Sequence, residues 1–131
     1  MAPVSALKPI RGARAWLALW LLACAAVVVV CLLPERDLPP VAPGADKVEH
    51  ALAFFLLMAS AVQLFAGGRA LLRAAAGLVL LGVAIELAQA AFTADRHADS
   101  SDALADAAGV LLGLAIARTP LRDLLLRWQP G

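Results

Sequence analysis

The stretch AWLALWLLACAAVVVVCLL, residues 15–33, carries no charged side chain, and the polar run PERD follows it at residues 34–37. A helix needs about 20 mainly apolar residues to cross the hydrocarbon core of a bilayer. The stretch has this length, so it predicts a membrane-spanning helix. Similar apolar stretches follow at about residues 48–66, 70–92 and 102–117. Because backbone polar groups in hydrocarbon must be hydrogen-bonded within the chain, we expect all four stretches to be helices.

The composition of the whole chain agrees with a protein of the lipid bilayer. Of its 131 residues, 63% are hydrophobic and 16% are charged, whereas soluble domains are about half apolar and about a quarter charged. A formal net charge of +1 argues against a nucleic-acid partner, and two cysteines are too few for a disulfide framework or a thiolate metal cluster. Short connections favour antiparallel neighbours. We therefore predict an all-α fold, a single domain over residues 1–131 that forms a bundle of four antiparallel transmembrane helices, and we expect no cofactor.

The distribution of basic residues predicts the orientation of this bundle. Most of the eleven Lys and Arg residues fall on one side of the predicted membrane: Lys8, Arg11, Arg14, Arg69, Arg73, Arg118, Arg122 and Arg127. Because cytoplasmic loops are enriched in Lys and Arg, we expect this side, with both termini, to face the cytoplasm. After Pro120, leucines and Trp128 recur at helical spacing opposite Arg122 and Arg127. This pattern predicts a short amphipathic C-terminal helix on the cytoplasmic surface, with a solvated, fraying tail as the alternative.

Polar side chains gather at the other, outer side of the predicted membrane. They occur at the start of the second stretch, at the end of the third, and from there into the fourth: Asp46, Lys47, His50, Glu86, Gln89, Arg96, Asp102 and Asp106. In the predicted topology these segments all reach the same surface. The middle of the bilayer is apolar, and Gln63 is the one polar side chain deep in the cytoplasmic half. An apolar midplane argues against an ion-coupled transporter, because such proteins usually carry buried charges near the centre.

Helical spacing sorts these residues onto faces. Asp102, Asp106, Gly109 and Gly113 follow one another at steps of four, three and four residues, so they share one face of the fourth helix. Glycines at such spacing let a neighbouring helix approach closely, so we expect this face to point into the bundle. Glu86 lies about 9 Å inside the end of its stretch. A carboxylate at that depth must be protonated, paired with Lys47, His50 or Arg96, or bound to a cation.

Several simpler interpretations stay open beside a functional site. Asp46, with Glu49 three residues later, has the pattern of a helix cap. The whole set is also compatible with a polar clasp that fixes one arrangement of the helices. His50, Glu86, Asp102 and Asp106 are weak candidates for metal ligands, since O and N ligands suit a hard or borderline cation. Their spacing matches no dedicated metal motif.

The order and spacing of these residues resemble the VanZ-like family of small integral membrane proteins. Asp46-Lys47-Val48-Glu49-His50 with Phe54 is similar to the family's D-K-x-x-H-x-x-x-F, and Glu86-Leu87-Ala88-Gln89 to its E-x-x-Q. Arg96, then Asp102, Asp106 and Gly109, resemble its R…D-x-x-x-N-x-x-G, with Asp106 where the family usually has Asn and with Gly113 at its following glycine. The resemblance covers about residues 46–117. It implies a multi-pass protein of the bacterial cytoplasmic (inner) membrane with its polar motif at the outer surface. The family is named for a protein associated with low-level resistance to teicoplanin, a lipid-bearing glycopeptide.

Three functions are compatible with these observations. In the first, the polar site binds a lipid headgroup, a cell-wall precursor or a lipoglycopeptide antibiotic. In the second, the protein is a structural or assembly subunit, with a membrane-protein partner or a second copy of itself, and its polar motif is a helix clasp. In the third, it is a metal-dependent membrane hydrolase. The sequence argues against an enzyme, because no Ser, Cys or Thr is convincingly placed as a nucleophile beside a base.

Overall fold

The computed structural model describes residues 6–33, 45–92 and 100–131, and these residues form an all-helical bundle. The long helices are α1 (Ala13–Leu32), α2 (Ala45–Leu64), α3 (Gly68–Phe92) and α4 (Ser100–Ala115). Two short 3-10 helices, η2 (Ile116–Arg118) and η3 (Pro120–Asp123), lead to α5 (Leu124–Trp128). The described residues contain no β-strand, only two isolated backbone bridges. The prediction of an all-α fold is confirmed.

Three of the helices, α1, α2 and α3, are each long and apolar enough to cross a membrane. The fourth, α4, has 16 residues, which is short of the about 20 that a straight span needs. It qualifies only together with the segment after it, residues 120–128, which is bent from it by 82°. The described part of the chain therefore offers three spans, or four if this bent pair is one of them. Both α2 and α4 begin slightly earlier than predicted, because polar residues such as Asp46 and Asp102 are readily included in a first helical turn.

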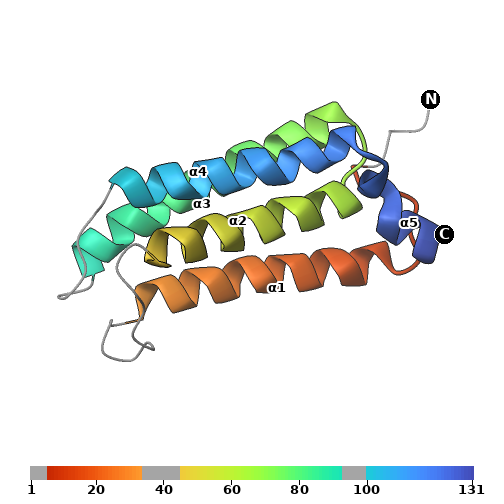
Figure 1. Ribbon diagram of the computed structural model, residues 1–131. Coiled ribbons are helices and arrows are strands. Elements are labelled where there is room, and N and C mark those ends of the chain that lie inside the picture. Colours follow the sequence, from red (N-terminus) through yellow and green to blue (C-terminus); the bar gives the residue numbers. More distant parts are fainter. Residues whose placement is uncertain (1–5, 34–44, 93–99) are drawn as a thin grey trace.

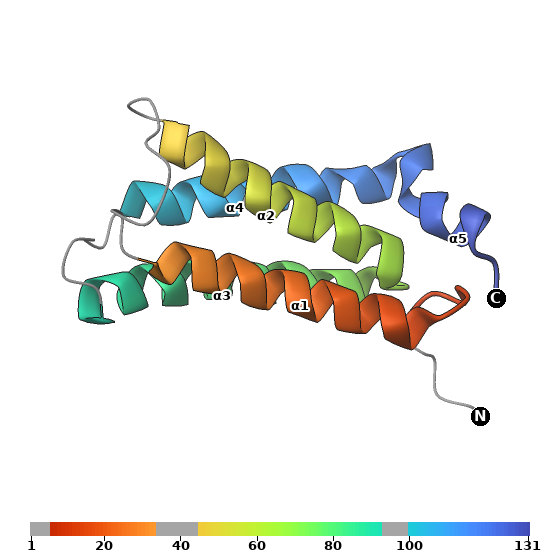
Figure 2. The ribbon, with the colours of Figure 1, turned by 90° about the horizontal axis from the view of Figure 1, so that it is seen from below.

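The four long helices lie side by side, and the chain passes back and forth along the bundle (Figure 1). In the view from below, α4 and α2 run along one side and α3 and α1 along the other (Figure 2). Helix α2 contacts each of the other three and packs most extensively against α4, whereas α1 and α4 do not contact each other. Helices α2 and α3 thus separate α1 from α4.

A narrow apolar core lies between α2, α3 and α4. Its buried side chains include Phe54, Met58 and Val62 of α2, Leu78 of α3 and Val110 of α4. Helix α1 has no buried residue and covers this core with half-buried side chains such as Val28 and Cys31. Many large apolar side chains point outward instead: Leu19, Leu22, Val48, Leu80, Leu87, Leu104, Leu111 and Leu112 are all more than half exposed. Such an apolar outer surface fits a bundle surrounded by lipid.

One end of the bundle, here called the terminal end, gathers the start of α1, the turn between α2 and α3, and the C-terminal segment (Figure 1). The backbone N–H of Lys8 donates to Leu64 O at 2.8 Å, and that of Ala66 donates to Ala6 O at 2.7 Å. On the other side of the same segment, the N–H of Arg11 donates to Gln129 O at 2.9 Å. The N-terminal segment is therefore held between the α2–α3 turn and residues 129–131.

Candidate functional site

Most of the polar residues singled out from the sequence lie at the opposite end of the bundle. The start of α2, the end of α3 and the start of α4 all lie there (Figure 1). Two polar pairs connect α2 with α4: Lys47 Nζ lies 2.7 Å from Asp102 Oδ1 in an ion pair, and His50 Nδ1 lies 3.0 Å from Asp106 Oδ1, which is an ion pair when His50 is protonated. We use the name polar cluster for the six residues Lys47, His50, Glu86, Gln89, Asp102 and Asp106.

The two pairs follow from the spacing within each helix. Lys47 and His50 are three residues apart on α2, and Asp102 and Asp106 are four apart on α4, so each helix presents its two side chains about one turn apart on one face. The pairs therefore stack at two depths. At the outer level the side chains of Lys47 and Asp102 are 39% and 13% exposed, whereas at the inner level those of His50 and Asp106 are 12% and 1% exposed.

Three glycines make room for this arrangement. A Cβ on Gly109 would lie 2.2 Å from Ala51 O, and one on Gly113 would lie 2.7 Å from Met58 Cβ, so both glycines sit directly against α2. On α3, a Cβ on Gly82 would lie 2.9 Å from Asp106 Oδ2. The carboxylate of Asp106 thus occupies a space bounded by His50 on one side and by the bare backbone of Gly82 on the other.

Gly82 was missed at the level of sequence. It lies four residues before Glu86 and seven before Gln89, so the three share one face of α3, and this spacing was the available signal.

The inner part of the cluster is buried and rich in carboxylates. Glu86 is 5% exposed, Gln89 is 2% exposed and Asp106 is 1% exposed. His50 lies against Asp106 at 3.0 Å, and the pair of Lys47 and Asp102 lies about one turn further out. The cluster therefore places three carboxyl groups around one lysine and one histidine. Two like charges in such proximity resist joint ionisation, so the site favours either a retained proton or an additional cationic group.

Asp106 has one carboxylate oxygen that finds no donor among the described residues. Asp106 Oδ1 is bonded to His50, but Oδ2 is buried and accepts no hydrogen bond from the described residues. Burying a polar atom without a hydrogen bond costs about 1–3 kcal/mol. The arrangement therefore retains an acceptor that its own described side chains do not use.

Gln89, of the cluster, and the remaining predicted site residues make contacts of their own. Gln89 Nε2 donates to Cys31 O at 2.7 Å, so this side chain binds a carbonyl in the last turn of α1 and joins α3 to α1. Asp46 is exposed in the first turn of α2, where a negative charge is favourable to the helix dipole. Arg96 lies outside the described residues. Gly109 and Gly113 lie at the contact of α4 with α2.

The weak metal candidates His50, Glu86, Asp102 and Asp106 do not form a ligand set. Within residues 6–33, 45–92 and 100–131, no group of three or more His, Cys, Asp or Glu side chains is placed to hold a metal ion. Their chemistry as found is that of ion pairing and hydrogen bonding, with Asp106 Oδ2 as an acceptor and Lys47 as a partly exposed ammonium donor.

Comparisons with protein-family models, with curated proteins and with solved structures gave no match to this chain.

Proposed function

We propose that the chain is a VanZ-like multi-pass protein of the bacterial cytoplasmic membrane, with four antiparallel spans and both termini in the cytoplasm. In this orientation the polar cluster faces the outer surface. It binds the polar head of an amphiphile, namely an envelope lipid, a cell-wall precursor or a lipoglycopeptide such as teicoplanin. The basic residues of the terminal end support the orientation, because Lys and Arg are enriched on the cytoplasmic side of membrane proteins.

The observation that carries this proposal is the buried oxygen Oδ2 of Asp106, which accepts no hydrogen bond from the described residues. A cluster that served only to hold helices together would gain by satisfying every buried polar atom. A site that receives a ligand instead keeps acceptors and charges for the groups that the ligand brings. An amine or hydroxyl group is the chemistry that a spare carboxylate oxygen accepts.

The outer ion pair gives such a ligand its point of entry. Lys47 is 39% exposed and forms the rim of the cluster, with Asp102 directly beneath it at 2.7 Å. A phosphate or carboxylate of the ligand would compete with Asp102 for the ammonium of Lys47. An amine or hydroxyl would then take the place of Lys47 on Asp102 and face the inner level. The hydrophobic part of an amphiphile would remain in the lipid beside α2 and α4.

A structural role for the same residues is the second candidate, and the pairing of the cluster favours it. Both ion pairs join α2 to α4, and Gln89 joins α3 to α1. These contacts hold all four long helices at one end of the bundle. In an assembly subunit they would fix the helix arrangement that a membrane-protein partner or a second copy recognises.

Asp106→Asn separates the two functions, because it keeps one oxygen for His50 and removes the carboxylate. The purified protein in detergent is melted and then titrated with teicoplanin or a polyprenyl phosphate in a calorimeter. For a binding site we expect the variant to melt at or above the wild-type temperature, since functional groups are often held at the expense of stability. Its affinity should fall about tenfold to hundredfold, the value of a hydrogen bond to a charged group.

Glu49→Gln is the matched control, because Glu49 is an exposed carboxylate on the same turn of α2 as His50. It should change neither melting nor binding. A destabilisation of about 3–5 kcal/mol in Asp106→Asn with unchanged affinity would overturn the binding site and establish the clasp, since this is the cost of breaking a buried ion pair.

A further inference from the structure

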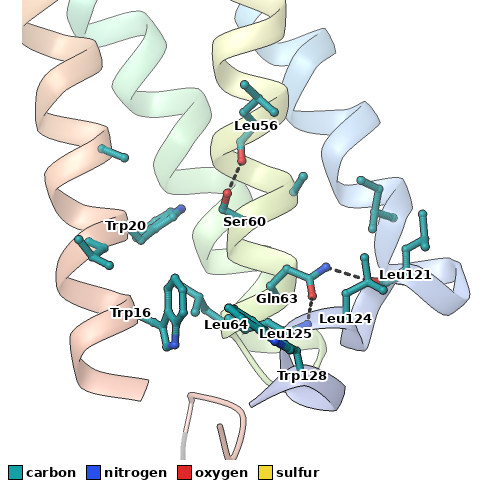
Figure 3. A pocket seen from close by; sticks show the side chains of 14 residues that line it. Trp16, Trp20, Leu56, Ser60, Gln63, Leu64, Leu121, Leu124, Leu125 and Trp128 are labelled. Atoms are coloured by element: carbon teal, nitrogen blue, oxygen red, sulfur yellow. Dashed lines mark hydrogen bonds between the residues drawn. The ribbon is translucent and has the colours of Figure 1, made fainter. Parts of the chain in front are cut away.

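A groove of about 770 Å³ lies at the terminal end, far from the polar cluster, between α1, α2 and the C-terminal segment. Figure 3 shows its wall, to which Trp16 and Trp20 contribute from α1, Leu56 and Gln63 from α2, and Leu125 and Trp128 from α5. Its volume falls within the range of small-molecule pockets, about 300–1,000 Å³. The residues predicted to form the site at the other end take no part in it.

The wall is apolar because polar groups of its side chains are hydrogen-bonded to other atoms of the protein. Gln63 Nε2 donates to Leu121 O at 2.8 Å, and its Oε1 accepts from the N–H of Leu125 at 3.0 Å (Figure 3). The hydroxyl of Ser60 donates to Leu56 O at 2.7 Å. The indole N–H of Trp20 donates to Leu57 O at 2.9 Å. The groove thus offers a hydrocarbon surface to an occupant.

The groove exists because α5 is attached to α2 and not to α1. The segment 120–128 turns by 82° from α4, and the two bonds of Gln63 hold it against α2. No contact joins α1 with α5. The groove is the space between these two helices. Trp16 and Trp20 line it from α1, and Trp128 lines it from α5 (Figure 3).

The surroundings of the groove are positively charged. Five exposed arginines belong to the segments at this end of the bundle: Arg11, Arg14, Arg118, Arg122 and Arg127. The one acidic residue of the C-terminal segment, Asp123, is paired with Lys8 at 2.9 Å and with Arg122 at 3.4 Å. An occupant with a long apolar part and an anionic head matches both properties of this site.

We propose that this groove holds an acyl chain of an anionic membrane phospholipid, whose phosphate lies among the arginines that flank the wall. The proposal depends on the protein being embedded in a bilayer. It does not depend on ligand binding by the polar cluster, which lies at the other end of the bundle and is tested with separate variants.

The tryptophans provide a direct measurement. The chain has three Trp and no Tyr, and all three Trp line the groove. The protein is placed in vesicles of phosphatidylcholine that contain a small fraction of phosphatidylglycerol, with brominated chains on one lipid or the other. Bromine quenches tryptophan on contact. We expect brominated phosphatidylglycerol to quench roughly fivefold or more beyond its mole fraction, the effect of one arginine near an anionic lipid, and brominated phosphatidylcholine to quench only in proportion.

Two pairs of variants locate the effect. Ala23→Phe fills the groove from α1 and should abolish the excess quenching, whereas Ala26→Phe, on the same helix but outside the groove, should preserve it. Arg127→Gln, next to the groove-lining Trp128, should reduce the preference for phosphatidylglycerol severalfold, whereas Arg73→Gln, an exposed arginine on α3, should not. Circular dichroism of each variant in the same vesicles establishes that it is folded.

Three outcomes would overturn the proposal. The first is equal quenching by the two brominated lipids in the wild-type protein. The second is an excess that survives Ala23→Phe in a folded variant. The third is tryptophan emission that depends on protein concentration and not on lipid composition, which would assign the groove to a second copy of the chain.

Discussion

At the scale of single residues, Gly109 determines how closely α4 approaches α2. A Cβ there would lie 2.2 Å from Ala51 O and 3.0 Å from Phe55 N, both of them backbone atoms that cannot rotate away. We expect Gly109→Ala to lower the free energy of unfolding by about 1–3 kcal/mol, the cost of overpacking. Thermal or denaturant unfolding in detergent measures it. Gly77→Ala is the matched control, because Gly77 is also helical and has nothing within 4 Å of an added Cβ.

The control should change stability in the opposite direction. Alanine is favoured over glycine in a helix by about 0.5–1 kcal/mol, so Gly77→Ala should stabilise the protein slightly. If both alanine variants were stabilised alike, the close contact between α4 and α2 would not exist in the folded protein.

The polar residues show what spacing can and cannot predict. The shared face of Asp102, Asp106 and Gly109 follows from helical periodicity alone, and in the structure all three lie toward α2. The choice of partners does not follow from it. Gln89 was grouped with the polar motif but binds Cys31 O on α1, because periodicity within α3 says nothing about how α3 is rotated against its neighbours.

At the scale of elements, the long helices were predictable from the sequence, whereas the path of the C-terminal segment after α4 was not. Long uncharged stretches have few alternatives in a bilayer, so the positions of α1, α2 and α3 follow from hydropathy to within a few residues. The C-terminal segment was predicted as one amphipathic helix from Pro120. It forms the 3-10 helix Pro120–Asp123 and then the short α5, bent away from α4. The contacts that hold this path come from Gln63 and from Lys8, both distant in sequence, so local periodicity could not reveal them.

Gln63 should therefore control the attachment of α5. It makes two hydrogen bonds to the segment, to Leu121 O and from the N–H of Leu125. Each is worth about 0.5–1.5 kcal/mol, so Gln63→Leu should raise the open population of the segment roughly fivefold to more than a hundredfold, while the bundle stays folded. The rate of trypsin cleavage after Arg122 measures this opening.

Ser60→Ala is the matched control for this experiment. Ser60 lines the same groove but bonds within its own helix, to Leu56 O. It should leave the cleavage rate unchanged. If Gln63→Leu were cleaved at the wild-type rate, contacts other than the two hydrogen bonds of the Gln63 side chain would hold α5.

At the scale of the whole molecule, the bundle has two chemically different ends joined by an apolar middle. The buried carboxylates gather where α2 and α4 begin, and the arginines and tryptophans gather where the termini meet. The core between them is narrow, and α1 contributes no buried residue. Contacts at the ends therefore carry much of the specificity of the fold, and at the terminal end one of them, the pair of Lys8 and Asp123, lies outside helices α1 to α4.

The ion pair between Lys8 and Asp123 makes that end sensitive to acid. Lys8 Nζ donates to Asp123 Oδ1 at 2.9 Å and also to the carbonyl of Arg122. The hydrogen bond from Lys8 holds the pKa of Asp123 below its usual value.

A carboxyl with a lowered pKa in the folded state stabilises the fold above its unfolded pKa of about 3.9, and this contribution is lost as the pH falls through the folded value. Asp123→Asn should therefore melt below the wild type at pH 7, and the difference should shrink as the pH falls below about 4 and vanish below the folded pKa of Asp123. Melting curves of both proteins across this range measure the difference, and Lys8→Gln should reproduce it because it removes the same pair. A difference that stayed constant down to pH 3 would show that the ion pair does not hold the N-terminal segment to the C-terminal one.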